Sequence, residues 1–214
     1  MTLSIVVFSD VICPWCFMGK RRLERALRET DLADSTEILW LPFELNPDMP
    51  AEGIAREDYR RAKFGAGRAD QLDREMTARG AEEGIAFAFD RMARTPNTRR
   101  AHKLIAHATR HERGGAVAEA LFRAYFEEAR DIGAEEVLLD IATAAGLDPE
   151  ESRAALASEE IEREVVALER RAQEVGISGV PFFIVDNEWA VSGAQPPEQW
   201  IAALRERAGA PAAG

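Results

Sequence analysis

The sequence predicts a mixed α/β protein in which two groups of strands flank a long run of helices. Strand signals occur near the N-terminus and return only late, from residue 182. From about residue 54 to residue 175 the apolar positions recur at helical spacing almost throughout. The predicted order is therefore β-α-β, a helical block and β-β-α. The first and last thirds could form one sheet, with the helical block inserted between them.

The N-terminal β-α-β segment is predicted from three patterns. Residues 4–8 form a short apolar run with β-branched side chains, which is typical of a buried strand. In the stretch that follows, Leu23 and Leu27 lie at helical spacing, and Arg and Lys occupy the other face. Residues 36–41 predict a second strand, which Pro42 ends.

The central block and the C-terminal segment also carry clear signals. Residues 148–151, Asp-Pro-Glu-Glu, predict a helix start with an Asp N-cap and proline at the first helical position. Strand patterns return at residues 182–185 and 189–191, and an Asp-Asn turn separates them. A last helix is predicted from about residue 197 to residue 207.

Composition excludes several classes of function. Apolar residues make up 46% of the 214-residue chain and charged residues 30%, which is typical of a globular protein. The net charge is −11, and acidic and basic residues are interleaved, so no basic stripe is predicted for nucleic acid. No apolar run approaches the roughly 20 residues that a membrane span needs. With two cysteines and no export signal, we expect a cytoplasmic protein.

The two cysteines lie in the segment Cys13-Pro14-Trp15-Cys16, between the first strand and the first helix. Pro14 suits the first helical position, so Cys13 is expected at the helix N-terminus. Free backbone N–H groups and the positive end of the helix dipole favour a thiolate there. Cys16 is one helical turn away and could close a small disulfide with Cys13. The pair is therefore predicted to make and break one disulfide.

Three neighbours of the cysteines, Pro14, Trp15 and Asp10, are candidates for tuning this chemistry, and Pro14 would act by setting the start of the helix. Asp10 lies three residues before Cys13, where its carboxylate could exchange a proton as Cys16 attacks, or could simply cap the turn. Trp15 could shield the disulfide or contact substrate, but it supplies no positive charge. We therefore expect a less depressed pKa for Cys13 than a histidine in that position would give.

Five segments of the sequence form a set that is typical of a known family. They are Phe8-Ser9-Asp10-Val11-Ile12-Cys13-Pro14-Trp15-Cys16-Phe17, Phe43-Glu44-Leu45-Asn46-Pro47, Asn97-Thr98 with Ala101-His102, Gly179-Val180-Pro181-Phe182-Phe183 and Val191-Ser192-Gly193-Ala194-Gln195. Together these segments resemble the DsbA family, and more closely its cytoplasmic FrnE-like branch. The resemblance covers nearly the whole chain, from residue 3 to about residue 205.

The resemblance implies a thioredoxin fold with a large all-helical insertion between the β-α-β and β-β-α halves. The expected division is a redox core of residues 1–50 plus 176–214 and an inserted domain of residues 51–175. A cis peptide bond before Pro181 is also implied, against a background in which about 5–6% of X-Pro bonds are cis. The Val180 backbone could then pair with an extended peptide or with glutathione.

The leading hypothesis is a thiol–disulfide oxidoreductase, acting as reductase, oxidase or isomerase, with Cys13 attacking and Cys16 resolving. Its expected partner is a disulfide- or dithiol-containing protein or small molecule, without a bound cofactor and with glutathione as a conceivable co-substrate. The alternative is a glutathione-dependent isomerase or transferase of the kappa-like type, acting on a small organic molecule. Such enzymes usually carry serine at the position of Cys13, so the presence of both cysteines favours redox chemistry.

A zinc site is the third interpretation, because Cys13, Cys16, His107 and His111 form a Cys₂His₂ set on paper. The gap of about 90 residues between the pairs is unlike zinc-finger spacing, so no metal site is expected. His102 is predicted to lie on the opposite face of that helix, as an ordinary packing histidine.

The inserted helices are expected to form a lid over the face that carries Cys13 and Pro181. Their apolar stripe, which includes Ala101, Leu104 and Ile105, is expected to pack mainly within the block as a separate small core.

Overall fold

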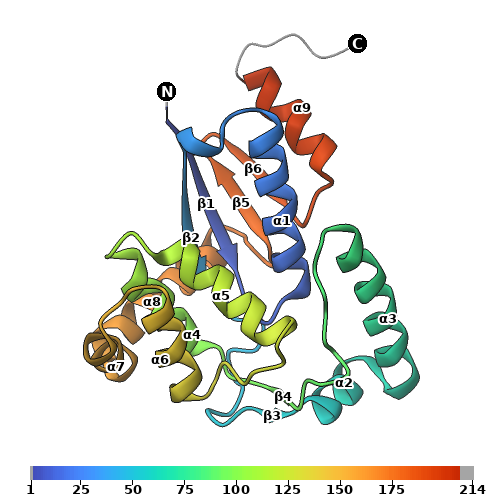
Figure 1. The fold of residues 1–214 in the computed structure, drawn as a ribbon, viewed down its shortest axis with the longest axis vertical. Coiled ribbons are helices and arrows are strands. Elements are labelled where there is room, and N and C mark those ends of the chain that lie inside the picture. Colours follow the sequence, from blue (N-terminus) through green and yellow to red (C-terminus); the bar gives the residue numbers. More distant parts are fainter. Residues whose placement is uncertain (1, 208–214) are drawn as a thin grey trace.

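A four-stranded sheet joins the two ends of the chain in the computed structural model, which describes residues 2–207 (Figure 1). The strand order is β2-β1-β5-β6. β1 (Leu3–Ser9) pairs in parallel with β2 (Thr36–Pro42) and antiparallel with β5 (Phe182–Val185), which pairs antiparallel with β6 (Trp189–Ser192). The N-terminal and C-terminal parts therefore form one sheet, as the sequence predicts.

The two faces of the sheet bury alternate residues of each strand, because successive side chains of a strand point to opposite faces. Val7 and Phe183 are register partners and are both fully buried on one face. That face carries α1 (Pro14–Glu29) and α9 (Pro197–Arg207), which pack on each other, and Trp200 of α9 meets Phe183 edge to face at 5.0 Å. Phe8 packs in a second cluster on the other face.

The inserted segment is mostly helical, as predicted, but it also contains a pair of two-residue strands that pair antiparallel. These strands are too short to produce a recognisable period in the sequence. The elements of the segment are β3 (Ile54–Ala55), α2 (Arg56–Phe64), α3 (Ala66–Glu82), β4 (Arg94–Thr95), α4 (Arg99–Thr109), α5 (Gly114–Phe126), α6 (Glu135–Ala144), α7 (Pro149–Ala157) and α8 (Glu159–Glu174).

The predicted start of α7 is confirmed in detail. Asp148 is the N-cap, and its carboxylate accepts hydrogen bonds from the backbone N–H groups of Glu150 and Glu151, both at 2.9 Å. Pro149 occupies the first helical position, where a backbone N–H is not needed.

The expectation of a separate core inside the insertion is wrong. Leu104 and Ile105 belong to the same buried cluster as Val7 of the sheet. The ring of Phe17 in α1 stacks on the ring of Phe122 in α5, with 5.1 Å between centroids and 3° between planes. An apolar stripe predicts that a helix face is buried, but it does not say against which partner. The division into a redox core of residues 1–50 plus 176–214 and an inserted domain of residues 51–175 therefore stays a proposal, which describes the order of segments along the chain.

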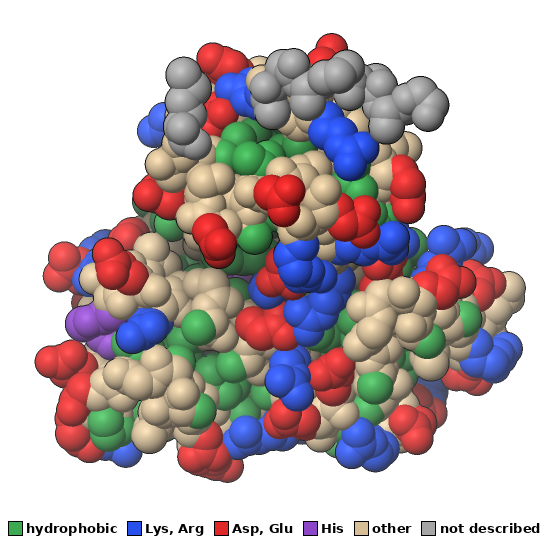
Figure 2. Space-filling view, turned by 45° about the horizontal axis from the view of Figure 1, so that its top comes forward, with side chains coloured by type: hydrophobic (Ala, Val, Ile, Leu, Met, Phe, Trp, Pro, Cys, Tyr) green, Lys and Arg blue, Asp and Glu red, His purple; other side chains and the backbone are tan. Residues whose placement is uncertain are grey.

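The surface agrees with the interleaved charges of the sequence. On the face shown in Figure 2, acidic and basic side chains alternate across the molecule. Among the described helices, none is long and apolar enough to cross a membrane.

Candidate active site

The Cys-Pro-Trp-Cys segment lies at the N-terminal end of α1, where the sequence predicts it. Cys13 is the N-cap of the helix with extended backbone angles, φ −91° and ψ 112°, and Pro14 is the first helical residue. The Cys13 N–H donates to the carbonyl of Asp10 at 3.0 Å, and the Cys16 N–H donates to the carbonyl of Cys13 at 3.0 Å. These bonds hold the turn between β1 and α1, so both sulfurs stay close to the helix terminus.

The two thiols have different surroundings, although both are free and buried. Cys13 lines a pocket, whereas the lining of that pocket does not include Cys16. Burial raises the pKa of the Cys16 thiol well above its usual range, and hydrogen bonding and charge repulsion from Cys13 raise it further. Cys16 is therefore a protonated, shielded thiol at neutral pH in the dithiol form.

The loop before β5 faces Cys13. The peptide bond between Val180 and Pro181 is cis, which confirms the prediction. The Cys13 thiol donates to the Val180 carbonyl, with 3.7 Å between sulfur and oxygen. Pro181 packs against α1 at Gly19, one turn beyond Cys16: a Cβ atom on Gly19 would lie 2.9 Å from Pro181 Cγ and 3.3 Å from Phe183 Cζ.

This close approach makes Gly19→Ala a sharp test of the packing. Alanine gains about 1 kcal/mol of helix propensity over glycine, but overpacking of a core costs about 1–3 kcal/mol. Since the new methyl group must displace Pro181 or Phe183, we expect a net loss of about 1 kcal/mol in the free energy of unfolding, measured by urea denaturation. Gly115→Ala is the matched control, because the nearest atom to its added Cβ is 3.7 Å away. Equal stability of the two variants would contradict the packing described here.

The pocket beside Cys13 has a volume of about 420 Å³ and is lined by several parts of the chain. The active-site turn contributes Cys13 and Trp15, the loop before β5 contributes Val180, and the opposite wall comes from α2 and α3. Trp15 is 39% exposed, and the Arg79 guanidinium of α3 lies 5.8 Å from its ring centroid. Part of the insertion thus faces Cys13 across the pocket, while α7 and α8 pack on α4, and α4 and α8 pack against β2.

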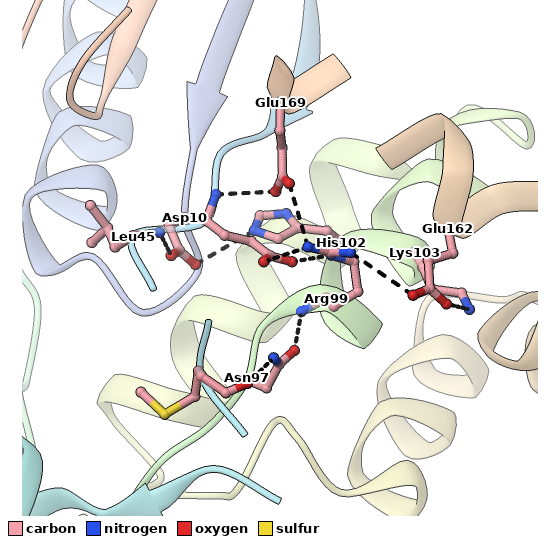
Figure 3. Close-up of polar contacts among 10 residues, drawn as sticks. Asp10, Leu45, Asn97, Arg99, His102, Lys103, Glu162 and Glu169 are labelled. Atoms are coloured by element: carbon pink, nitrogen blue, oxygen red, sulfur yellow. Dashed lines mark hydrogen bonds and ion pairs between the residues drawn. The ribbon is translucent and has the colours of Figure 1, made fainter. Parts of the chain in front are cut away.

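Asp10 is fully buried at the end of β1 and serves as a backbone cap. Its carboxylate accepts from the backbone N–H of Leu45 at 2.7 Å and of Ile12 at 3.4 Å. The capping role that the sequence suggests is therefore present. A second contact was not foreseen: the Nε2 atom of His102 in α4 lies 3.5 Å from an Asp10 carboxylate oxygen (Figure 3).

His102 belongs to a buried cluster of charged groups that connects four segments of the fold (Figure 3). Arg99 donates to both carboxylate oxygens of Glu44, and Glu169 of α8 accepts the Glu44 backbone N–H at 3.1 Å. Burial opposes the charged form of His102, but the nearby Asp10 carboxylate, with Glu169 and Glu44, outweighs it and raises the pKa of His102. Burial and the nearby Glu44 raise the pKa of Glu169 to about 7.

The comparison with known families settles the class of this chain. The family model described as the DSBA-like thioredoxin domain matches residues 4–205. The chain belongs to this DsbA-like family. Its fold is accordingly the DsbA-like thioredoxin fold, and it is an oxidoreductase-family member by this match.

Three known proteins are similar to this DsbA-like protein over most of its length. A probable DsbA oxidoreductase from Streptomyces coelicolor is 34% identical, with a TM-score of 0.88 over 99% of this chain and 92% of that chain. YwbO of Bacillus subtilis is 28% identical over 86% of this chain and 88% of its own length. The cytosolic disulfide reductase DsbM of Pseudomonas aeruginosa, solved with GSH, is 18% identical and shares the fold, with a TM-score of 0.64 over 96% and 99% of the two chains.

The Cys₂His₂ zinc interpretation does not fit this DsbA-like protein. Among the described residues, His107 and His111 group with Glu151 of α7, with ligand atoms within 4.8 Å of one another, and neither cysteine belongs to the group. His102 lies apart from them and faces Asp10, as expected for the opposite face of α4.

The sequence does not predict the buried charged cluster that contains Glu44, Arg99, His102 and Glu169. Glu44 and His102 lie inside two of the segments that carry the family resemblance, which was the available signal. Asn97 lies in the same segment as His102, and its side chain accepts the Arg99 backbone N–H at 2.9 Å at the start of α4.

Proposed function

We propose that this protein is a cytoplasmic thiol–disulfide oxidoreductase of the FrnE-like branch, with Cys13 as attacking thiol and Cys16 as resolving thiol. The observation that carries the proposal is the asymmetry of the pair. Cys13 lies at a helix N-terminus and lines a pocket beside Val180, whereas Cys16 is fully enclosed and its pKa is raised. Helix N-termini are positions where reactive cysteines occur, because free backbone N–H groups point toward the sulfur.

The reaction proceeds by two exchanges. The Cys13 thiolate attacks one sulfur of a substrate disulfide, the substrate S–S bond breaks, and one half leaves as a thiolate that takes up a proton. Cys16 then loses its proton and attacks Cys13 Sγ, which releases the second half and leaves a Cys13–Cys16 disulfide. The substrate gains two electrons and the enzyme loses two. The reverse sequence oxidises a dithiol, and partial cycles isomerise disulfides.

The surrounding residues have supporting roles in this proposal. Pro14 sets the start of the helix, Trp15 borders the substrate at the pocket, and Asp10 holds the turn that carries the thiols. The Val180 backbone and Pro181 form the surface on which an extended substrate lies. The structural likeness to DsbM, which was solved with GSH, supports glutathione as a co-substrate that returns the oxidised enzyme to the dithiol state.

Alkylation of the reduced protein tests the assignment of the two thiols. With limiting iodoacetamide at neutral pH, we expect Cys13 to be modified several times faster than Cys16, because thiolate is the reactive form and Cys16 is buried and protonated. Peptide mass spectrometry after brief exposure measures the ratio. Urea-unfolded protein is the control, in which the two rates should become similar. Faster modification of Cys16 in the folded protein would overturn the assignment.

A glutathione-dependent isomerase or transferase remains the second candidate, since a pocket of about 420 Å³ beside Cys13 has the size of a small-molecule site. The two functions differ in their need for Cys16. Disulfide turnover requires a resolving thiol, whereas activation of a bound glutathione thiol does not. Full activity of Cys16→Ser toward a glutathione-dependent reaction would favour the second candidate.

A further inference from the structure

The pocket beside Cys13 is rich in cations, although the whole chain carries a net charge of −11. Four cationic side chains line it, Arg56, Arg60, Lys63 and Arg79, against the two carboxylates of Asp73 and Glu75. All six come from α2 and α3, which lie beside the N-terminal end of α1 (Figure 1). The local excess of positive charge is therefore a property of this wall of the pocket.

These cations are only partly neutralised within the protein. Arg56 and Arg60 share a single carboxylate, Asp73, with 2.7 Å between Arg56 Nη2 and an oxygen of Asp73. Within residues 2–207, Lys63 and Arg79 have no carboxylate at ion-pair distance: Lys63 donates to the Tyr59 hydroxyl at 2.6 Å. Both would gain from an anion that enters the pocket.

Arg60 gives a second, independent indication of a missing acceptor. Its Nε atom is buried and has no hydrogen-bond partner among the described residues. Burial lowers the pKa of Arg60 against the attraction of Asp73, and the charge of Arg56 lowers it further. A buried donor without a partner is costly, so a ligand oxygen at this position would be stabilising.

The rest of the lining is apolar and largely aromatic or sulfur-containing. It includes Leu45, Phe64, Met76, Phe89, Met92 and Tyr125. A wall of this kind favours a ligand with a flat or apolar body over a fully hydrated ligand. Cationic side chains that stack on an aromatic ring of the ligand add to the attraction. The Arg56 guanidinium already lies 5.1 Å from the ring centroid of Phe89.

We infer that this pocket selects a small disulfide whose carboxylate is carried on an aromatic or apolar body, with the reactive sulfur at Cys13. The inference rests on the proposed function and names its substrate class. Arg60, Lys63 and Arg79 bind the carboxylate, and the apolar wall holds the body. The exchange is the one described above: the substrate S–S bond breaks and the Cys13–Cys16 disulfide forms. The assay uses enzyme that is reduced beforehand and freed of reductant, because dithiothreitol reduces aromatic disulfides directly; kcat and KM then describe how the rate of this single exchange depends on substrate concentration.

The test compares variants on two aromatic disulfides, the acidic dithiobis(nitrobenzoate) and the neutral dithiodipyridine. Disulfides differ in intrinsic reactivity, but this difference cancels when each variant is divided by wild type on the same substrate. Lys63→Gln and Arg79→Gln remove exposed cations of the pocket and should leave the fold intact. We expect kcat/KM for the acidic disulfide to fall about tenfold in the double variant, mainly through KM, and for the neutral one less than about twofold. Arg163→Gln, whose side chain on α8 is 72% exposed and outside the pocket, is the control and should change neither.

The outcomes separate this inference from the proposed function. Equal losses on both disulfides, or none, would overturn the selection of acidic substrates while disulfide reduction itself stands. A protein disulfide, that of insulin, reduced with a higher kcat/KM than the acidic disulfide would overturn the small-molecule assignment. If wild type reduces none of the three, the proposed function fails first. Independently of turnover, 4-nitrobenzoate should slow alkylation of Cys13 in wild type and lose this effect in the double variant.

Discussion

Cys16→Ser is expected to trap the protein in a covalent complex with its substrate. Cys13 can still attack a disulfide, but the mixed disulfide cannot be resolved without the second thiol, so turnover should fall to the uncatalysed rate. Non-reducing electrophoresis and intact mass measurement after incubation with oxidised substrate would show the adduct. The mass increase should equal one half of the substrate disulfide.

Cys13→Ser is the matched variant and should give neither turnover nor an adduct. Its remaining thiol, Cys16, is 1% exposed and has a raised pKa, so it is a poor nucleophile toward an external disulfide. If adducts form on Cys16 in the Cys13→Ser variant as fast as they form on Cys13 in the Cys16→Ser variant, the assignment of attacking and resolving thiols is wrong. Adduct formation in neither single variant would contradict the mixed-disulfide mechanism.

The free energy of unfolding is expected to fall as pH rises through neutrality because of Glu169. Its pKa is about 7 in the folded protein against an ordinary value of 4.5, since burial and Glu44 disfavour its charge. The folded state therefore holds a proton that the unfolded state releases, and the stabilisation is complete below about pH 4.5 and is lost as pH rises through about 7. The raised pKa of His102 acts in the same direction. At about 1.4 kcal/mol per pKa unit, the difference between 4.5 and about 7 corresponds to about 3.5 kcal/mol, which solvent screening of this carboxyl reduces to about 2–3 kcal/mol.

Glu169→Gln should remove most of this pH dependence, because glutamine resembles the protonated carboxyl in shape and stays neutral. Urea denaturation at a series of values from about pH 5 to about pH 8 measures the slope. Glu160→Gln, an exposed change on the same helix, is the control and should keep the wild-type slope. A slope that is unchanged by Glu169→Gln would assign the buried proton to another member of the cluster.

The sequence predicts the sheet and the active-site turn because both depend on local patterns. The apolar runs of β1 and β5, the Asp148 cap and the proline after Cys13 each restrict the backbone within a few residues. The position of Cys13 at the start of α1 follows from that local information. The family resemblance adds the cis bond before Pro181, which local spacing alone does not indicate.

The buried charged cluster could not be predicted in the same way. Glu44, Arg99 and Glu169 meet only because β2, α4 and α8 pack together, and each of these residues separately resembles an exposed polar position. The pairing of β3 with β4 is missed for a related reason, since two residues provide too little pattern to recognise a strand. The choice of partner for the apolar stripe of α4 is likewise a property of tertiary packing.

The burial of Phe17 limits how the inserted helices can be exchanged or removed. Phe17 follows Cys16 directly and is fully buried between the active-site helix and α5, where it stacks on Phe122. Removing the inserted helices would expose this ring, which directly follows the resolving thiol in α1. The inserted helices therefore cannot be deleted without exposing part of the core. A chimera that imports the corresponding helices of a relative must also import the residue that faces them from position 17, or the packing of α1 on α5 is lost.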